Sequence, residues 1–196
     1  MTPLARADLP EDTAALARFL VGATLVRELP EGRLAGRIVE TEAYLRDDPA
    51  SHAYRGPTRR NRALFLERGH VYVYLAYGLS WMLNVSGGPE GVGEGVLLRA
   101  LEPLEGADLM ARHRGTARPL DLARGPGRLA MAFRIGPDLD GADLCTPGPL
   151  WLATPLRPPA ALGTSPRIGI TKAADLPLRF YERGNPHVSG PRRLSP

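Results

Sequence analysis

Cysteine, lysine and long apolar runs are nearly missing from this sequence, and each scarcity removes a class of protein. Cys145 is the only cysteine, which excludes an internal disulfide and any zinc site built from several cysteines. Lys172 is the only lysine, so Schiff-base chemistry has almost no amine to work with. No 18 apolar residues run together, and residues 1–10 lack the apolar core of a signal peptide. We therefore expect a soluble, intracellular protein that is not secreted and has no membrane segment.

The composition indicates a loop-rich globular protein with a basic surface. A chain of 196 residues fits one domain, here residues 1–196, and is long enough to bury a sizeable core. Its 22 glycines and 20 prolines are more than usual, which predicts many turns and few long helices. The formal net charge is +4, and nearly all basic side chains are arginines, whose planar fork suits phosphate contacts. This charge suits a polyanionic partner such as nucleic acid, although many basic proteins have no such partner. The sequence shows no sign of a stable oligomer, so we expect a monomer.

Hydrophobic periodicity and turn residues predict an α+β chain built from antiparallel hairpins. The first hairpin joins residues 23–29 and 34–44, and the second joins 71–77 and 79–85, which leaves Tyr77 at or near its tip. Further elements are predicted as helices over 14–20, capped by Asp12 or Thr13, 108–114 and 129–133, and as strands over 96–101, 150–153, 167–171 and 177–181. Residues 190–196 are expected to be flexible.

The stretch from Gly36 to Tyr44 carries the most unusual pattern. Its apolar residues are followed by Glu40, Glu42 and Tyr44 at every second position, so their side chains should share one face of a strand. Two carboxylates beside an aromatic ring suit a reactive pocket for a flat substrate, although a solvated acidic face would give the same pattern. Arg99 lies in the middle of a buried-type strand and needs a partner there, for which Glu42 would serve.

Two further segments have the chemistry to contact phosphates. Residues 45–62 form a long polar loop that contains Asp47, Asp48, His52, Tyr54 and several arginines, among them Arg55, Arg59 and Arg60. A loop of this length in a compact domain usually has a function. The turn at residues 125–127, followed by Arg128, opens a helix whose free amides could bind a DNA phosphate, although a plain turn explains it equally well.

Several motifs, taken in order, resemble the alkyladenine (3-methyladenine) DNA glycosylase family over roughly residues 10–190. They are GRIVETEAY at 36–44, DDPASHAYRGPTRRN at 47–61, YVYLAYG at 72–78, Leu83-Asn84, VLLRALEPLEG at 96–106, LARGPGRL at 122–129 and PLRFYERGNPHVS at 177–189. The resemblance implies a single domain with a curved antiparallel sheet, short surrounding helices and a protruding hairpin that contacts DNA. It also implies a cytoplasmic, nucleoid-associated enzyme, or a nuclear one in a eukaryote.

By this resemblance the protein excises damaged purines, such as 3-methyladenine, 7-methylguanine, hypoxanthine and ethenoadenine, from duplex DNA. Glu42 matches the general base that activates water, and Arg99 matches the arginine that holds water and carboxylate. Tyr44, His52, Tyr74 and Asn84 match residues that enclose and screen the flipped base, and Tyr77 matches the wedge. Arg55, Arg59, Arg60 and Arg128 are expected at the DNA. The sequence departs from the family at Leu79, Ser80 and Trp81, where a bulky aromatic residue or histidine is common.

Two other functions stay open at this point. A metal-dependent nuclease or hydrolase could use Glu40, Glu42, Asp47, Asp48 and His52, because carboxylates and histidine are usual metal ligands. A non-catalytic module could bind damaged DNA through basic loops and exposed tyrosines. For a glycosylase we expect no cofactor and no lyase step, since Lys172 lies far from the matched site residues in sequence.

Overall fold

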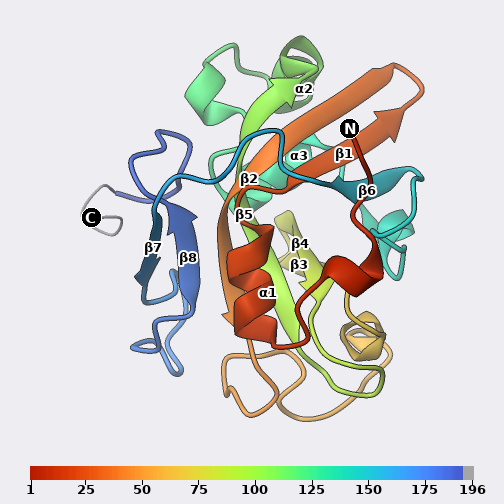
Figure 1. The fold of residues 1–196 in the computed structure, drawn as a ribbon, viewed down its shortest axis with the longest axis vertical. Helices are drawn as coiled ribbons and strands as arrows, with labels where there is room; N and C mark the ends of the chain where they lie inside the picture. Colours follow the sequence, from red (N-terminus) through yellow and green to blue (C-terminus); the bar gives the residue numbers. More distant parts are fainter. Residues whose placement is uncertain (192–196) are drawn as a thin grey trace.

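The computed structural model describes residues 1–191, and its regular structure centres on one antiparallel sheet (Figure 1). The strand order is β3-β4-β5-β2-β1-β6, with β8 paired to both β2 and β7. The strands are β1 (Thr24–Leu29), β2 (Gly32–Tyr44), β3 (Val71–Ala76), β4 (Ser80–Ser86), β5 (Gly95–Glu105), β6 (Leu150–Ala153), β7 (Leu162–Ser165) and β8 (Arg179–Glu182). This single α+β domain with a curled sheet confirms the predicted fold class.

The strand β2 is the spine of the sheet because it is longer than its neighbours and changes partner along its length. Its first half pairs with β1, from Gly32 to Arg37, and its second half pairs with β8, from Glu40 to Glu42. On the other edge β5 pairs with β2 from Ala35 to Tyr44, with register shifts near Gly36 and Glu40. Such irregularities bend and twist a sheet locally. Glu40 therefore lies at an irregular point of the sheet, and Glu42 follows it two residues later.

Short helices cover the sheet and its ends. They are α1 (Thr13–Leu20), α2 (Ala107–Arg114) and α3 (Pro126–Ala132), and single 3₁₀ turns occur at Arg6–Asp8, Arg62–Phe65, Pro119–Asp121 and Pro137–Leu139. The Asp12 side chain accepts a hydrogen bond from Ala15 N–H at 2.7 Å, which confirms one of the two predicted caps of α1. Among residues 1–191 no helix is long and apolar enough to cross a membrane.

The strand predicted over residues 167–171 is wrong. This segment is irregular and has glycine 169 at φ +81°, and the strand that pairs with β8 is β7, over residues 162–165. Arg167 is buried, and the N–H of Ile168 is used by a side chain instead of a strand ladder. Alternating apolar residues alone therefore gave a false strand signal. We call residues 167–173 the strap.

Two other boundaries differ from expectation. The last predicted strand, 177–181, lies at 179–182 because the proline at its start has no N–H for the ladder. The tail predicted to be flexible lies mostly outside the described residues, and Gly190, its first residue, accepts a hydrogen bond from Arg124 Nη2 at 3.2 Å.

The hairpin of β3 and β4 turns through Tyr77 and Gly78, both with positive φ, at 51° and 70°. Three residues, Tyr77 to Leu79, connect the paired Ala76 and Ser80, and positive φ in such a turn normally favours asparagine or glycine. A tyrosine there is unusual, and its side chain is 91% exposed. The prediction that Tyr77 lies at the tip of the second hairpin is confirmed.

A buried ion pair fastens β8 to β2. Arg37 Nε lies 3.2 Å from Glu182 Oε2, and both side chains are buried. Burial alone would raise the pKa of Glu182, but hydrogen bonds from Arg37, Ala160 N–H and Asn185 outweigh it and lower the pKa to about 2. Because the carboxylate is favoured in the folded state, it stabilises the fold above its ordinary pKa of 4.5.

We predict that this stabilisation is lost as pH falls from 4.5 towards about 2. The loss should amount to about 3 kcal/mol in the free energy of unfolding. Urea denaturation at several pH values would measure it, and Glu182→Gln should lack this part of the pH dependence. An equal pH dependence in both proteins would contradict the assignment.

Candidate active site

A cavity of about 450 Å³ opens between the end of β2, the β3–β4 hairpin, the loop 45–62 and the strap. Its walls include all four residues predicted to enclose a base and the predicted arginine: Tyr44, His52, Tyr74, Asn84 and Arg99. Residues far apart in the chain therefore meet in one place. The volume is in the range of small-molecule sites.

Glu42 lies behind this cavity and is completely buried. Its Oε2 accepts a hydrogen bond from Tyr44 OH at 3.0 Å and lies 3.1 Å from Arg99 Nη1, while Oε1 accepts from Ile168 N–H at 2.7 Å. The expected pairing of Arg99 with Glu42 is confirmed. A carboxylate offers about four acceptor positions, and these three contacts use two on Oε2 and one on Oε1, so one position on Oε1 is left over.

Tyr44 is held as a hydrogen-bond donor beside Glu42. Burial raises the pKa of Tyr44, and the charge of Glu42 raises it further, so the phenol keeps its proton at neutral pH. The guanidinium carbon of Arg167 lies 4.6 Å from the centre of the Tyr44 ring. Arg167 is fixed in turn by an ion pair with Asp48 and by hydrogen bonds to the carbonyls of Ala43 and Ala173. The strap therefore holds the tyrosine ring in place.

The opposite wall is aromatic and uncharged. The rings of His52 and Tyr74 lie 4.3 Å apart between centres at an angle of 64°, and Tyr72 stacks on Tyr74 at 5.6 Å. Tyr72, which we expected to pack, is buried, and its hydroxyl lies 2.9 Å from His52 Nδ1. Burial and, secondarily, the charge of Arg60 lower the pKa of His52, so its ring is neutral at neutral pH. Such a wall suits a flat, electron-poor ring.

Asn84 closes the inner end of the cavity. Its side chain is 6% exposed, and Nδ2 donates to the carbonyl of Tyr72 at 3.2 Å. This bond sets the orientation of the amide group, so the side chain is a fixed obstacle to a ligand.

The arginines predicted to contact DNA lie in two separate places. Arg55, Arg59 and Arg60 are exposed on the loop 45–62, and Arg60 also lines the cavity mouth. Arg128 lies elsewhere, in a hollow of about 980 Å³ between the hairpin, α2 and α3, where its Nη1 lies 2.6 Å from Asp121 Oδ1. The arginines thus flank the hairpin instead of forming one patch.

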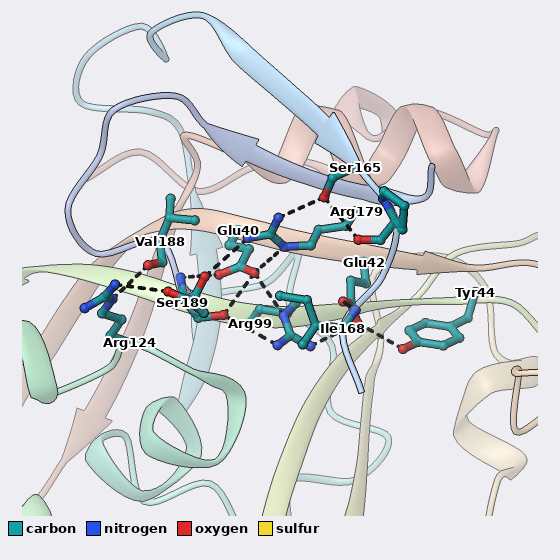
Figure 2. A network of polar contacts seen from close by, with 12 residues as sticks. Glu40, Glu42, Tyr44, Arg99, Arg124, Ser165, Ile168, Arg179, Val188 and Ser189 are labelled. Carbon is teal, nitrogen blue, oxygen red and sulfur yellow. Dashed lines mark hydrogen bonds and ion pairs between the residues drawn. The ribbon is translucent and has the colours of Figure 1, made fainter. Parts of the chain in front are cut away.

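Figure 2 shows a second layer of contacts around Glu40, in which the roles of Arg179 and Ser189 were not predicted from the sequence. Glu40 bonds to Arg99, to Arg179 and to Ser189, and none of these four side chains is more than 9% exposed. The charged residue in the apolar segment at 167–171 could have indicated the role of Arg167, because a buried arginine needs partners. No local sequence pattern indicated the roles of Arg179 and Ser189, because their partner, Glu40, is distant in sequence.

The residues proposed for a metal site do not gather into one. Among residues 1–191 no three His, Cys, Asp or Glu side chains lie close enough together to hold a metal ion. Glu40 and Glu42 face guanidinium groups, and Asp48 pairs with Arg167. These carboxylates therefore already have cationic partners.

Comparison with known proteins agrees with this geometry. The family model described as "Methylpurine-DNA glycosylase (MPG)" matches residues 7–186. Three similar relatives share the name "Putative 3-methyladenine DNA glycosylase". The protein of Mesorhizobium japonicum is 64% identical over 98% of this chain and 92% of its own length. Those of Paraburkholderia phytofirmans and Methanoculleus marisnigri are 54% and 53% identical, over 98% and 91% of this chain and 90% and 94% of their own lengths.

With a family match across most of the chain, relatives that align over nearly their whole length, and a buried glutamate beside an aromatic cavity, this chain belongs to the methylpurine-DNA glycosylase family.

Proposed function

We propose that this protein is a monofunctional, monomeric DNA repair glycosylase that removes alkylated or deaminated purines from duplex DNA. The observation that supports this best is the position of Glu42, a buried carboxylate held by three residues that line the aromatic cavity, Tyr44, Arg99 and Ile168. The substrates are 3-methyladenine, 7-methylguanine, hypoxanthine and ethenoadenine. The products are the free base and an abasic site. The enzyme acts in the compartment that contains the chromosome, which is the cytoplasm of a prokaryote or the nucleus of a eukaryote.

The base must leave the helix before it can enter the cavity. Extrusion of a nucleotide is unfavourable by about a few kcal/mol and is easiest for a weakly paired, damaged base. Tyr77, exposed at the hairpin tip, fills the space that the nucleotide leaves and so offsets part of the lost stacking. The base then stacks against Tyr44 and Tyr74, and Asn84 rejects purines with an unsuitable exocyclic group.

Hydrolysis is carried out by Glu42 and a water molecule. As the bond between sugar and base breaks, positive charge develops on the sugar, and the nearby carboxylate stabilises it. Glu42 accepts the proton of the water that attacks C1′, and Arg99 and Ile168 N–H keep the carboxylate in position. An alkylated purine that is already cationic leaves without an added proton.

The charged surface on both sides of the hairpin supports a path for the DNA backbone. Arg55 and Lys172 lie with Tyr77 around a hollow of about 390 Å³ next to the cavity mouth. The larger hollow beyond the hairpin contains five arginines, namely Arg112, Arg114, Arg124, Arg128 and Arg134. Phosphates attract such groups irrespective of base sequence.

Substitution of Glu42 by glutamine tests the chemistry. We expect Glu42→Gln to bind lesion DNA as the wild type does and to slow excision about 10²- to 10⁴-fold, because the amide cannot accept the proton. The measurement is single-turnover release of hypoxanthine or ethenoadenine from a duplex oligonucleotide, with EDTA present. Inhibition of the wild type by EDTA would favour a metal-dependent enzyme, and equal function of both proteins would favour a non-catalytic binding module.

Substitution of Tyr77 tests the wedge. Tyr77→Ala and Tyr77→Gly should both weaken lesion binding and flipping, measured by 2-aminopurine fluorescence beside the lesion. Tyr77→Gly should leave the free energy of unfolding unchanged or raise it by up to about 1 kcal/mol, because glycine adopts positive φ easily. Leu156→Ala, which removes another exposed apolar side chain, is the matched control. Equal effects of the Tyr77 and Leu156 variants would contradict the assignment.

The prediction that the enzyme has no lyase step can now be based on the position of Lys172 in the structure. Distance in sequence was a poor guide, since Lys172 lies on the same hollow as Tyr77. However, Lys172 is not among the residues that line the main cavity. We therefore expect no strand nicking without added alkali and no covalent complex after borohydride treatment. A complex that forms in the wild type and is lost in Lys172→Gln would show the prediction to be wrong.

A further inference from the structure

Arg99 is shared between two carboxylates on neighbouring positions of β2. Its Nε donates to Glu40 Oε1 at 3.0 Å, and its Nη1 lies 3.1 Å from Glu42 Oε2 (Figure 2). The guanidinium is planar, so a contact at Nε largely sets the direction in which Nη1 points. The position of Glu40 therefore controls how Arg99 meets Glu42.

Glu40 itself cannot take part in the chemistry. It is completely buried, and its two oxygens accept four hydrogen bonds, which is the usual capacity of a carboxylate. The donors are Arg99 Nε at 3.0 Å, Arg179 Nε at 2.6 Å, Ser189 Oγ at 3.0 Å and Ser189 N–H at 2.6 Å. Oε1 accepts three of these bonds and Oε2 accepts one, and Glu40 does not line the cavity, so a ligand in the cavity does not contact it.

The charges in this network balance. Burial alone would raise the pKa of Glu40, but the charges of Arg99 and Arg179 outweigh it and hold the pKa below its ordinary value. Two carboxylates, Glu40 and Glu42, thus face two guanidinium groups. Without the charge of Glu40, Arg99 would neutralise Glu42 more strongly and make it a weaker acceptor of protons.

The last described residues close the network. Ser189 supplies two of the four donors to Glu40, and the same segment is anchored by Arg124, whose Nε donates to Val188 O at 2.8 Å and whose Nη2 donates to Gly190 O at 3.2 Å. Figure 2 shows this segment on the side of Glu40 away from Tyr44. Residues 188–190 therefore support the layer around Glu40 without lining the cavity.

We propose that Glu40, held by Arg179 and Ser189, is a positioning residue that orients Arg99 and divides its charge, so that Glu42 stays an effective base. This inference rests on the proposed function. The groups that face Glu42 in the wild type are Tyr44 and Tyr74, Arg99 on β5, Ile168 N–H on the strap, and Arg179 opposite it on β8.

The test compares the pH dependence of excision in wild type and Glu40→Gln. With saturating enzyme, the single-turnover rate of Glu40→Gln should fall about 10- to 100-fold, as for residues that orient metal ligands, while lesion binding is retained. Because Glu42 would face an excess of positive charge, the acid limb of the profile should move to lower pH. Ser189→Ala keeps the hydrogen bond from the backbone N–H of residue 189 to Glu40. It should therefore lower the single-turnover rate and move the acid limb in the same directions, but by smaller amounts.

Glu182→Gln is the matched control, since Glu182 is an equally buried carboxylate paired with an arginine and has no contact with Glu42. It should lower stability and leave the rate and the acid limb unchanged. The proposal would be overturned if Glu40→Gln kept the rate and pH profile of the wild type. It would also be overturned if Glu182→Gln changed the rate and profile as much as Glu40→Gln does. If Glu40→Gln does not fold, an unchanged profile in Ser189→Ala would overturn it.

A crystal structure gives a readout that does not depend on activity. In Glu40→Gln, Arg99 should turn so that two of its nitrogens contact Glu42, and an unmoved Arg99 would overturn the proposal. If the wild type releases no base from any lesion, the proposed function fails, while the position of Arg99 in this variant still decides whether Glu40 orients it.

Discussion

Two glutamates, both completely buried in the middle of a sheet, set requirements that the surrounding structure must meet. A buried carboxylate is unfavourable by several kcal/mol unless it is paired and fully hydrogen-bonded. Glu40 and Glu42 obtain their partners from β5, β8, the strap and the segment after β8. The positions of these four parts are therefore linked, and a shift in any one of them would leave a charge without a partner.

The change of partner along β2 makes this arrangement possible. Because β1 leaves the sheet beside Arg37, the edge of β2 from Glu40 onward is free to pair with β8, which brings Arg179 opposite Glu42. The register shifts between β2 and β5 fall at the same place. A regular sheet would present Glu40 and Glu42 identically. Here Glu40 is enclosed by four donors, whereas the partners of Glu42 are residues that line the cavity.

The sequence predicted those parts whose signal is local. Alternation and turn residues predicted both hairpins, the charge of Arg99 predicted a carboxylate partner, and motif order predicted which side chains meet in the cavity. It could not predict the strap, because a segment whose N–H bonds to Glu42 has the same apolar alternation as a strand. Nor could it place Lys172 beside Tyr77, since that proximity depends on how the whole chain folds.

Tyr77 shows how the demands of the fold and of the proposed reaction diverge. Positive φ at a residue other than glycine is unfavourable by about 1–2 kcal/mol, and an aromatic ring that is 91% exposed gains nothing from burial. The fold alone would be served better by asparagine or glycine at this turn. If the ring is buried in DNA, its exposed apolar surface contributes to binding. The rigid turn already holds the ring in place, so binding costs little further conformational entropy. The proposed wedge role would therefore account for a tyrosine at the hairpin tip, which the fold of the free protein does not.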